Sequence, residues 1–538
     1  MKNVIHVGII LTGELIPSWI YQVAAKIAGP DYADLKLIVL NESARPEDDD
    51  PKASSFFRLH RKLDRQVFGK RYNFDQLVDT AALFQGVARC SLHPERESGW
   101  AEITSHKLDV LLNFSPFDFS TVHFPLARFG VWQYVIGNGN DNRLAYTYEQ
   151  MANEGPVLEV SVLASNGEFE DEAVIHRSWV PVNYHSIQIN QHHAYGLCAL
   201  IVPRLICGIS RLGGKYFFQQ KLRYQDTATR GDSEVFPLPS SYKAWMNWWK
   251  MVFKYGYQRA VFQDSWSWFI LMTKNPQPLP FSASGLTPVI PPRDRFWADP
   301  FVVSEDGKTL LFVEEFIYRN NKGHISVLEL DKKFRVVGTE KLLEKPYHLS
   351  YPFVFEHGHV WYMIPETSGN KTIELYRCDH FPDKWSFVMN LMEEVDAVDS
   401  TLFFHEGKWW LFTAISEWLG FSDYKELFVF YSGDLFTTKW EPHPCNPVVT
   451  DVQTSRPAGR IFIQNGKIIR PSQDCSIRYG RAVSLNQITI LNENSYAEKA
   501  LLNIEANWDK DLKGVHTFNL DKDMTVVDAY RYRNRFDV

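Results

Sequence analysis

The strongest clue to the architecture is the stretch Phe296-Trp297-Ala298-Asp299-Pro300-Phe301-Val302-Val303, because variants of its pattern return downstream. Each copy has a polar residue entering a short apolar strand, then a glycine-containing turn and a second, aromatic strand. Further copies begin at Ser350, Val398 and Ser455. Self-similarity at a period of roughly 50 residues is typical of a β-propeller, whose repeated blades surround a central channel. We expect the polar residue that heads each innermost strand to point into that channel.

Composition limits the class of protein. The chain has 538 residues, too many for one ordinary domain, and 45% are hydrophobic, enough for sizeable cores. The aromatic content of 14% fits β-rich structure and surfaces that pack on sugar rings. A formal net charge of −7 argues against nucleic-acid binding. The six cysteines are scattered without a CxxC pair, which indicates reduced thiols in a cytoplasmic protein. We expect no metal and no cofactor.

The first part of the chain predicts an α/β domain over residues 1–205. Val4–Leu11 reads as a buried strand, Pro17–Ala28 as a helix and Leu35–Leu40 as the next strand. Strand, helix and strand at this spacing form a βαβ unit with a parallel sheet, to which Asp109–Phe114 adds a later strand. No G-x-G-x-x-G follows the first strand, so a dinucleotide site is not expected.

Residues 206–290 predict a helical connector and linker, and residues 291–538 predict a five-bladed all-β propeller. Trp245–Trp268 is apolar and basic. We interpret it as a helix that braces the two domains, with a peripheral helix on the inner face of a membrane as the alternative. Trp266–Met272 could pair with the last blade and close the ring. We find no uninterrupted apolar stretch long enough to span a bilayer.

The blade heads resemble those of the five-bladed furanosidase propellers, the clan of arabinanases, β-xylosidases and invertases. Trp297-Ala298-Asp299-Pro300-Phe301 resembles the first-blade motif, whose Asp is general base or nucleophile. Val398-Asp399-Ser400-Thr401-Leu402-Phe403-Phe404 resembles the third-blade motif, whose Asp tunes the acid and holds the sugar. Where that clan has its general acid, a Glu, this chain reads Thr454-Ser455-Arg456-Pro457. A guanidinium cannot donate a proton at neutral pH.

Glycoside hydrolysis normally needs two carboxyl groups across the bond. Glu366 could supply the second one, and so could Glu314 or Glu315. In some furanosidases a histidine in the last blade holds a central cation or a water, and His516 resembles it. A satisfied channel histidine is the other interpretation of His516.

A second resemblance covers roughly residues 290 to 500. Its motifs resemble the propeller domain of the glucosamine inositolphosphorylceramide transferase family, and the resemblance implies a role in sugar transfer during glycan or glycolipid assembly. Plant members carry a separate nucleotide-sugar glycosyltransferase domain after the propeller. The motifs are Trp297-Ala298-Asp299-Pro300-Phe301, Tyr362-Met363-Ile364-Pro365-Glu366-Thr367, Ser455-Arg456-Pro457-Ala458-Gly459, and Arg470-Pro471-Ser472-Gln473-Asp474-Cys475 followed by Tyr479-Gly480.

Residues 1–205 resemble the catalytic domain of methionyl-tRNA and sugar N-formyltransferases. Where that family reads Asn-x-His, this chain has Trp132-Gln133-Tyr134, and the catalytic Asp aligns with Glu170. Neither Trp nor Tyr can do what a neutral imidazole does near its own pKa. We therefore expect a formyltransferase-like binding platform instead of folate-dependent formyl transfer. The polar loop Asn138–Asn142 lies just beyond the substituted position and is a candidate ligand loop.

The leading hypothesis is a glycosyltransferase of cell-surface glycan or glycolipid assembly, with a phosphate-activated sugar donor bound in the channel. Asp299 would act as base toward the acceptor hydroxyl, while Asp399 and Glu366 would orient sugar hydroxyls. Guanidinium groups bind phosphate through paired hydrogen bonds, so Arg456 and Arg470 would hold the leaving group. A phosphate leaving group needs no protonation, which favours transfer over hydrolysis. The other candidate substrate-binding residues are Asp474, His516 and Trp297.

Three alternatives stay open at this point. They are a glycoside hydrolase, a sugar N-formyltransferase and a non-catalytic carbohydrate-binding scaffold. The two arginines could also serve structure alone, by forming ion pairs with the acidic residues Asp299, Asp399 or Asp474.

Overall fold

The structure is a computed structural model with two compact units, Met1–Lys254 and Tyr255–Val538. It describes residues 3–41, 53–92, 97–117, 119, 122, 124–137, 143–165, 173–215, 217–218, 237–274, 279, 281–417, 425–522 and 524–534. Glu170 and the loop 138–142 lie outside the described residues, so their predicted roles stay predictions.

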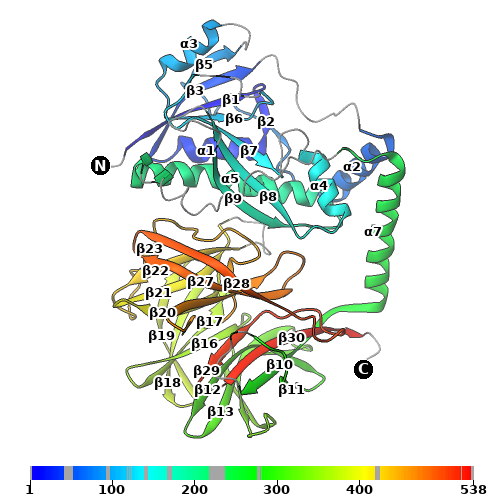
Figure 1. Ribbon diagram of the computed structural model, residues 1–538, viewed down its shortest axis with the longest axis vertical. Helices are drawn as coiled ribbons and strands as arrows, with labels where there is room; N and C mark the ends of the chain where they lie inside the picture. Colours follow the sequence, from blue (N-terminus) through cyan, green and yellow to red (C-terminus); the bar gives the residue numbers. More distant parts are fainter. Residues whose placement is uncertain are drawn as a thin grey trace. The chain divides into compact units, whose positions relative to one another are not determined.

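A seven-stranded sheet with the order β5-β3-β1-β6-β7-β8-β9 forms the centre of the first unit (Figure 1). The pairs from β5 to β7 are parallel, whereas β7, β8 and β9 are antiparallel neighbours. The predicted α/β domain is confirmed, although its sheet is parallel only in part. The strands are β1 (Ile5–Leu11), β3 (Ala33–Asn41), β5 (Ala88–Leu92), β6 (Val110–Asn113), β7 (Val131–Ile136), β8 (Val157–Ser165) and β9 (Ala173–Pro181).

Helices surround this sheet, and a short pair, β2 (Leu15–Pro17) with β4 (Leu77–Asp79), lies apart from it. Apolar side chains recur on α1 at Trp19, Ile20, Val23, Ala24 and Ile27, and all of them are buried. That spacing is why the segment forms a helix against the sheet. The helices are α1 (Ser18–Ala28), α2 (Ser55–Phe68), α3 (Glu97–Ser105), α4 (Arg143–Ala152), α5 (Ile187–Leu212) and α7 (Ser241–Val261).

Helix α5 corrects one prediction, because it is long and apolar enough to cross a membrane. It has 26 residues, and its most apolar window has a mean hydropathy of 1.5. Within the first unit, however, 67% of that window is buried, and α5 contacts α1, α2, α4 and the strands β8 and β9. Burial on this scale is typical of the core helix of a folded domain.

The second unit is a five-bladed β-propeller, as predicted. Each blade is an antiparallel sheet, and in blades 1 to 3 the strands follow one another in chain order from the innermost strand outward. Blade 1 contains β12 (Arg295–Glu305), β13 (Lys308–Ile317), β14 (Lys322–Leu330) and β15 (Val336–Leu343). Blade 2 contains β16 (Ser350–His357), β17 (Val360–Thr367), β18 (Thr372–His380) and β19 (Lys384–Glu393). Blade 3 contains β20 (Ala397–His405), β21 (Lys408–Ile415), β22 (Glu426–Ser432) and β23 (Glu441–Pro442).

Blade 4 is less regular, because β24 (Arg456–Pro457) and β25 (Phe462–Gln464) both pair with β26 (Lys467–Asp474), which is followed by β27 (Ala482–Asn492) and β28 (Ser495–Glu505). Blade 5 joins distant parts of the chain: β29 (Phe518–Asp521) and β30 (Met524–Asn534) are completed by β10 (Phe262–Lys274) and β11 (Thr287–Val289). The predicted pairing of residues 266–272 with the last blade is therefore confirmed. The predicted helix over residues 245–268 ends earlier, at Val261.

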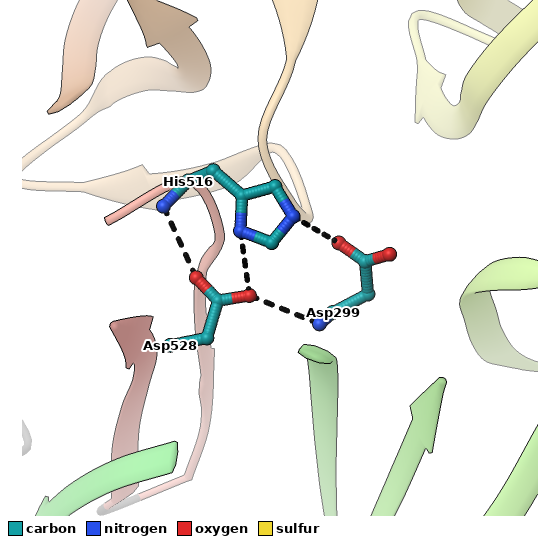
Figure 2. A group of neighbouring side chains, drawn as sticks. All are labelled: Asp299, His516 and Asp528. Atoms are coloured by element: carbon teal, nitrogen blue, oxygen red, sulfur yellow. Dashed lines mark hydrogen bonds and ion pairs between the residues drawn. The ribbon is translucent and has the colours of Figure 1, made fainter. Parts of the chain in front are cut away.

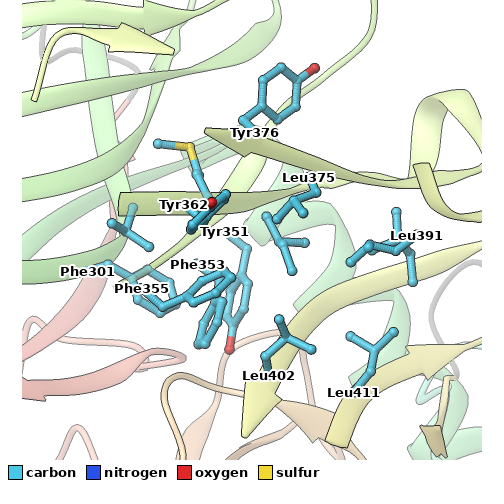
Figure 3. Packing of buried hydrophobic residues seen from close by; sticks show 14 of the residues in the cluster. Phe301, Tyr351, Phe353, Phe355, Tyr362, Leu375, Tyr376, Leu391, Leu402 and Leu411 are labelled. Carbon is cyan, nitrogen blue, oxygen red and sulfur yellow. The ribbon is translucent and has the colours of Figure 1, made fainter. Parts of the chain in front are cut away.

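Aromatic and aliphatic side chains fill the space between neighbouring blades. The rings of Phe301 and Tyr351 meet edge to face, with centroids 5.0 Å apart, and Phe301 meets Phe353 in the same way. Figure 3 shows these rings beside Leu402 and Leu411 of blade 3. Edge-to-face pairs of this kind stabilise the packing by about 0.5–1.5 kcal/mol each. The core therefore fixes the heads of the innermost strands.

Candidate active site at the propeller centre

The heads of three innermost strands share an unusual backbone. Asp299, Tyr351 and Asp399 have positive φ angles of 50°, 45° and 53°. At each of them the strand pairing shifts register, between Ala298 and Phe301 in the first case. Non-glycine residues rarely adopt this conformation, and the surrounding structure must hold it. The repeated bulge turns these three residues away from the regular alternation of their strands.

Asp299 of blade 1 lies among residues of blades 2 and 5. Its Oδ1 accepts a hydrogen bond from the hydroxyl of Thr517 at 2.9 Å, and its Oδ2 accepts one from the backbone N–H of Tyr351 at 3.1 Å. His516 Nε2 lies 3.2 Å from Oδ1. The side chain is buried, so these contacts fix its orientation.

Asp528 of β30 completes this arrangement. One of its oxygens accepts hydrogen bonds from the backbone N–H groups of His516 and Thr517, and the other accepts one from the N–H of Asp299 at 3.0 Å. His516 Nδ1 lies 2.8 Å from Asp528, so the imidazole is held between two carboxyl groups (Figure 2). Burial by itself would lower the pKa of His516, but Asp528 and Asp299 raise it above its ordinary value.

The ligand atoms of Asp299, His516 and Asp528 lie within 4.8 Å of one another, close enough to share one cation. Two carboxylates and an imidazole form a donor set that suits a divalent metal. In the structure the same atoms bind one another. The expectation that the protein uses no metal stays a prediction.

Asp399 of blade 3 meets blade 4. Its Oδ2 accepts hydrogen bonds from Nε of Arg456 and from Nε2 of Gln473, the latter at 3.1 Å. Burial raises the pKa of Asp399 to about 6, although Arg456 acts in the opposite direction. The Arg456 guanidinium also lies over the Tyr479 ring, 4.9 Å from its centroid. The interpretation of Arg456 as the partner of a central carboxylate therefore agrees with the structure.

Glu366 brings blade 2 into the same group. Its Oε2 lies 3.9 Å from Nη2 of Arg456 and accepts no hydrogen bond from the described residues. Its Oε1 accepts a hydrogen bond from Ser368 at 2.9 Å. The side chains of Glu366 and Arg456 keep 10% and 19% of their surface exposed, so solvent reaches the group here. We call Asp299, Glu366, Asp399, Arg456, His516 and Asp528 the central cluster.

Two glutamates beside the central cluster have pKa values shifted in opposite directions. Burial raises the pKa of Glu314 well above its ordinary value, and Asp299 and Glu366 raise it further. A neutral carboxyl at this place could donate a proton. Burial also acts to raise the pKa of Glu315, but hydrogen bonds from His324, Arg295 and other groups lower it to about 2. Glu315 is therefore a structural carboxylate.

Three predicted substrate-binding residues have partners outside the central cluster. Arg470 is 1% exposed, and its Nε and Nη2 bind Glu498, while Nη2 also donates to the carbonyl of Thr454. Asp474 pairs with Arg481, and Trp297 Nε1 donates to Glu315 at 3.2 Å. Residues 470 and 474 share one face of β26 whereas 473 lies on the other, because side chains alternate along a strand.

Sequence reasoning missed Asp528, Gln473 and Thr517. Asp528 lies inside the apolar run Val526-Val527-Asp528-Ala529, and a carboxylate there is a signal because charged residues are almost never fully buried without partners. Gln473 belonged to a recognised motif, but its role depends on the register that places it opposite Arg456.

In the first unit, the side chains that replace the Asn-x-His motif of the formyltransferases do not support formyl transfer. Trp132 is buried and its Nε1 donates to the carbonyl of Phe129 at 2.8 Å. The hydroxyl of Tyr134 donates to the carbonyl of Cys198 at 2.5 Å, and burial raises the pKa of Tyr134 well above its ordinary value. Both side chains are therefore buried and hydrogen-bonded in the core of the first unit.

The fold and the central cluster define a five-bladed propeller with an acidic centre that contains one partly buried guanidinium, that of Arg456. Residues 285–531 match the family model described as glucosamine inositolphosphorylceramide transferase 1, N-terminal. The predicted resemblance of the propeller to this family is confirmed.

The proteins of that name from rice (Oryza sativa subsp. japonica) and Arabidopsis thaliana are similar to this chain. The rice protein is 35% identical over 208 residues, which cover 38% of this chain and 27% of that protein. The Arabidopsis protein is 31% identical over 221 residues, which cover 40% of this chain and 28% of that protein. The similarity thus spans little more than a quarter of either relative's length.

Among solved structures, the α-L-arabinofuranosidase of Lactobacillus brevis matches with a TM-score of 0.35 and 15% identity, covering 46% of this chain and 87% of that chain. A match at this level carries no weight for function.

Proposed function

We propose that the protein is a glycosyltransferase of cell-surface glycan or glycolipid assembly, with the central cluster as the site of a phosphate-activated sugar donor. The proposal rests on the guanidinium of Arg456, which keeps donors available for a ligand. Its Nε is bound by Asp399, but Nη1 makes no hydrogen bond with the described residues and Nη2 has only the 3.9 Å contact with Glu366. Donors of a charged guanidinium beside sugar-binding carboxylates suit a sugar joined to phosphate.

The reaction balances without a cofactor. A bond forms between the acceptor oxygen and the anomeric carbon of the donor, and the bond from that carbon to the phosphate oxygen breaks. The phosphate leaves with the electron pair, and the proton of the acceptor hydroxyl passes to Asp299. Burial raises the pKa of Asp299 above its usual range, which makes its carboxylate a stronger base, although His516 acts in the opposite direction. Oδ2 accepts one hydrogen bond, so a lone pair remains for the proton.

Glu366 would hold the sugar, and Asp399 would hold Arg456 in place. Glu366 Oε2 is buried and accepts no hydrogen bond from the described residues, so a sugar hydroxyl could satisfy it. Asp399 would act through its bond to Arg456, because it fixes the guanidinium plane. Of the two arginines predicted to bind the phosphate, only Arg456 would do so, because Arg470 is already bound to Glu498.

The test is mass spectrometry of products after incubation with panels of sugar nucleotides and sugar phosphates and with lipid or glycan acceptors. We expect the acceptor to gain one sugar and Asp299→Asn to lose this activity by about 10²-fold or more, the usual contribution of a general base. Asp331→Asn changes a partly exposed turn residue of blade 1 outside the central cluster; it is the control and should keep full activity. Free sugar as the sole product would exclude transfer.

One observation favours glycoside hydrolysis as a second candidate. Glu314 has a raised pKa and lies in the electrostatic field of Asp299 and Glu366, so it could serve as the acid that sequence analysis did not find in blade 4. A hydrolase would release reducing sugar from aryl furanosides, and Glu314→Gln would abolish the release while sugar nucleotides gave no product.

A further inference from the structure

Helix α7 exposes an apolar stripe. Its large apolar residues recur at the spacing of one helix face, and two of them, Tyr242 and Phe253, are each 70% exposed. The opposite face, with Ala244, Asn247 and Trp248, packs on the first unit: Asn247 binds the hydroxyl of Tyr148 at 3.2 Å. The helix thus has a satisfied inner face and an uncovered apolar outer face. The outer stripe contains Tyr242, Trp245, Met246, Trp249, Val252 and Phe253.

Helix α2 has the same character. Leu59, Leu63 and Val67 recur every four residues and are exposed, Val67 by 70%. Its inner face holds the buried Phe57, His60 and Asp64. Monomeric proteins rarely leave such rows of large apolar side chains uncovered, because exposing them to water is unfavourable.

The two helices are neighbours within the first unit. The hydroxyl of Ser54, which precedes α2, donates to the carbonyl of Pro239, which precedes α7, at 2.9 Å. The rings of Phe56 and Trp248 meet 6.4 Å apart. Figure 1 shows the start of α7 beside α2. The exposed rows therefore lie on two neighbouring helices, and we call them together the α2–α7 surface.

This surface is basic although the chain carries a net charge of −7. Residues 241–254 contain three lysines and no acidic residue, and the only acid of α2, Asp64, is buried. Two of those lysines pair with glutamates of the first unit, at Glu149 and Glu154. Arg58, Lys62 and Lys250 are exposed and form no ion pair with any described residue.

We propose that the α2–α7 surface docks on a lipid bilayer that contains anionic headgroups. Tryptophan and tyrosine rings favour the depth at which headgroups meet acyl chains, and lysine and arginine side chains reach from there to phosphate. Each basic residue near such a surface strengthens binding by about fivefold. Exposed apolar rings and unpaired basic side chains would bind such a bilayer whatever the sugar chemistry, and docking would bring the enzyme to a glycolipid acceptor.

The experiment is flotation of the full-length chain with vesicles of phosphatidylcholine, with and without phosphatidylglycerol. We expect the protein to float with the anionic vesicles. A triple variant, Val67→Ser, Tyr242→Ser and Phe253→Ser, should lower the partition coefficient at least about tenfold. The matched control changes exposed apolar residues of the propeller, Val337→Ser, Phe387→Ser and Ile463→Ser, and should float like the parent.

Charge variants test the headgroup part of the proposal. Lys62→Gln and Lys250→Gln should each reduce binding to anionic vesicles by about fivefold and leave binding to neutral vesicles unchanged. Absence of flotation, or an equal loss in the propeller control, would overturn the proposal. So would a dimer, measured by light scattering, that only the α2–α7 triple variant converts to monomer without any vesicle binding. Flotation needs no substrate, so these outcomes do not depend on whether sugar transfer is observed.

Discussion

Arg456 and Asp399, which are 57 positions apart in the chain, form a partly buried ion pair between blades 4 and 3. Asp399 adopts a positive φ to present its carboxylate, and Arg456 enters from the shortest of the innermost strands. The pair links the two blades and also sets the guanidinium beside Glu366. Stability and substrate binding are therefore coupled at this one contact.

Replacing Arg456 should show this coupling. Arg456→Gln leaves Asp399 and Glu366 buried without their cation, and we expect the free energy of unfolding to fall by about 3–5 kcal/mol. The double variant Arg456→Gln with Asp399→Asn removes both charges and should be destabilised by less than the sum of the single variants. Denaturant titration of the four proteins measures this difference. Strict additivity would mean that the two side chains do not interact.

Arg470 should matter for folding alone. Arg470→Met breaks the two-bond contact with Glu498 in the interior of blade 4 and should cost about 3–5 kcal/mol of stability. Because the guanidinium has partners outside the central cluster, KM for the sugar donor should not change. Adding Glu498→Leu removes the remaining buried charge and should restore part of the stability. If a stable Arg470 variant had a raised KM for the sugar donor, Arg470 would contribute to substrate binding after all.

The lowered pKa of Glu315 predicts that acid destabilises the fold. Its pKa is about 2 in the folded protein against an ordinary value of 4.5, so its carboxylate stabilises the fold at neutral pH. This contribution is present above pH 4.5 and is lost as the pH falls toward 2, with a full size on the order of 3 kcal/mol. Glu315→Gln should remove that part of the dependence, whereas Glu329→Gln, an exposed change in the same blade, should not. Denaturation midpoints measured between pH 2 and 7 decide the point.

Gly459 is predicted to tolerate no side chain. Its φ is 139°, and a Cβ would lie 2.1 Å from the carbonyl oxygen of Phe518 in blade 5. We expect Gly459→Ala to cost about 3 kcal/mol or more, from overlap and strain together. Gly407 also has a positive φ, 77°, but nothing lies within 4 Å of a Cβ there, so Gly407→Ala should cost about 1 kcal/mol. Equal losses in the two variants would show that backbone strain alone matters.

The repeats made the propeller and its two central aspartates predictable, because Asp299 and Asp399 occupy the same place in motifs that recur. Residues outside the repeat were harder to assign. The motif from Arg470 to Cys475 could be recognised in the sequence. The sequence alone does not show which of its side chains face the centre of the propeller. That choice depends on a pairing register fixed by contacts far away in sequence, which put Gln473 opposite Arg456.

The pairing of β10 with β30 ties the start of the propeller to its end. Residues 262–274 are made before any other strand of the ring, yet their partner is complete only when Asn534 has been synthesised. A fragment cut to begin at residue 285, where the family match starts, would leave β30 with an unpaired backbone edge. Such an edge recruits strands from other molecules, so a fragment made for expression should begin before Phe262 to remain soluble.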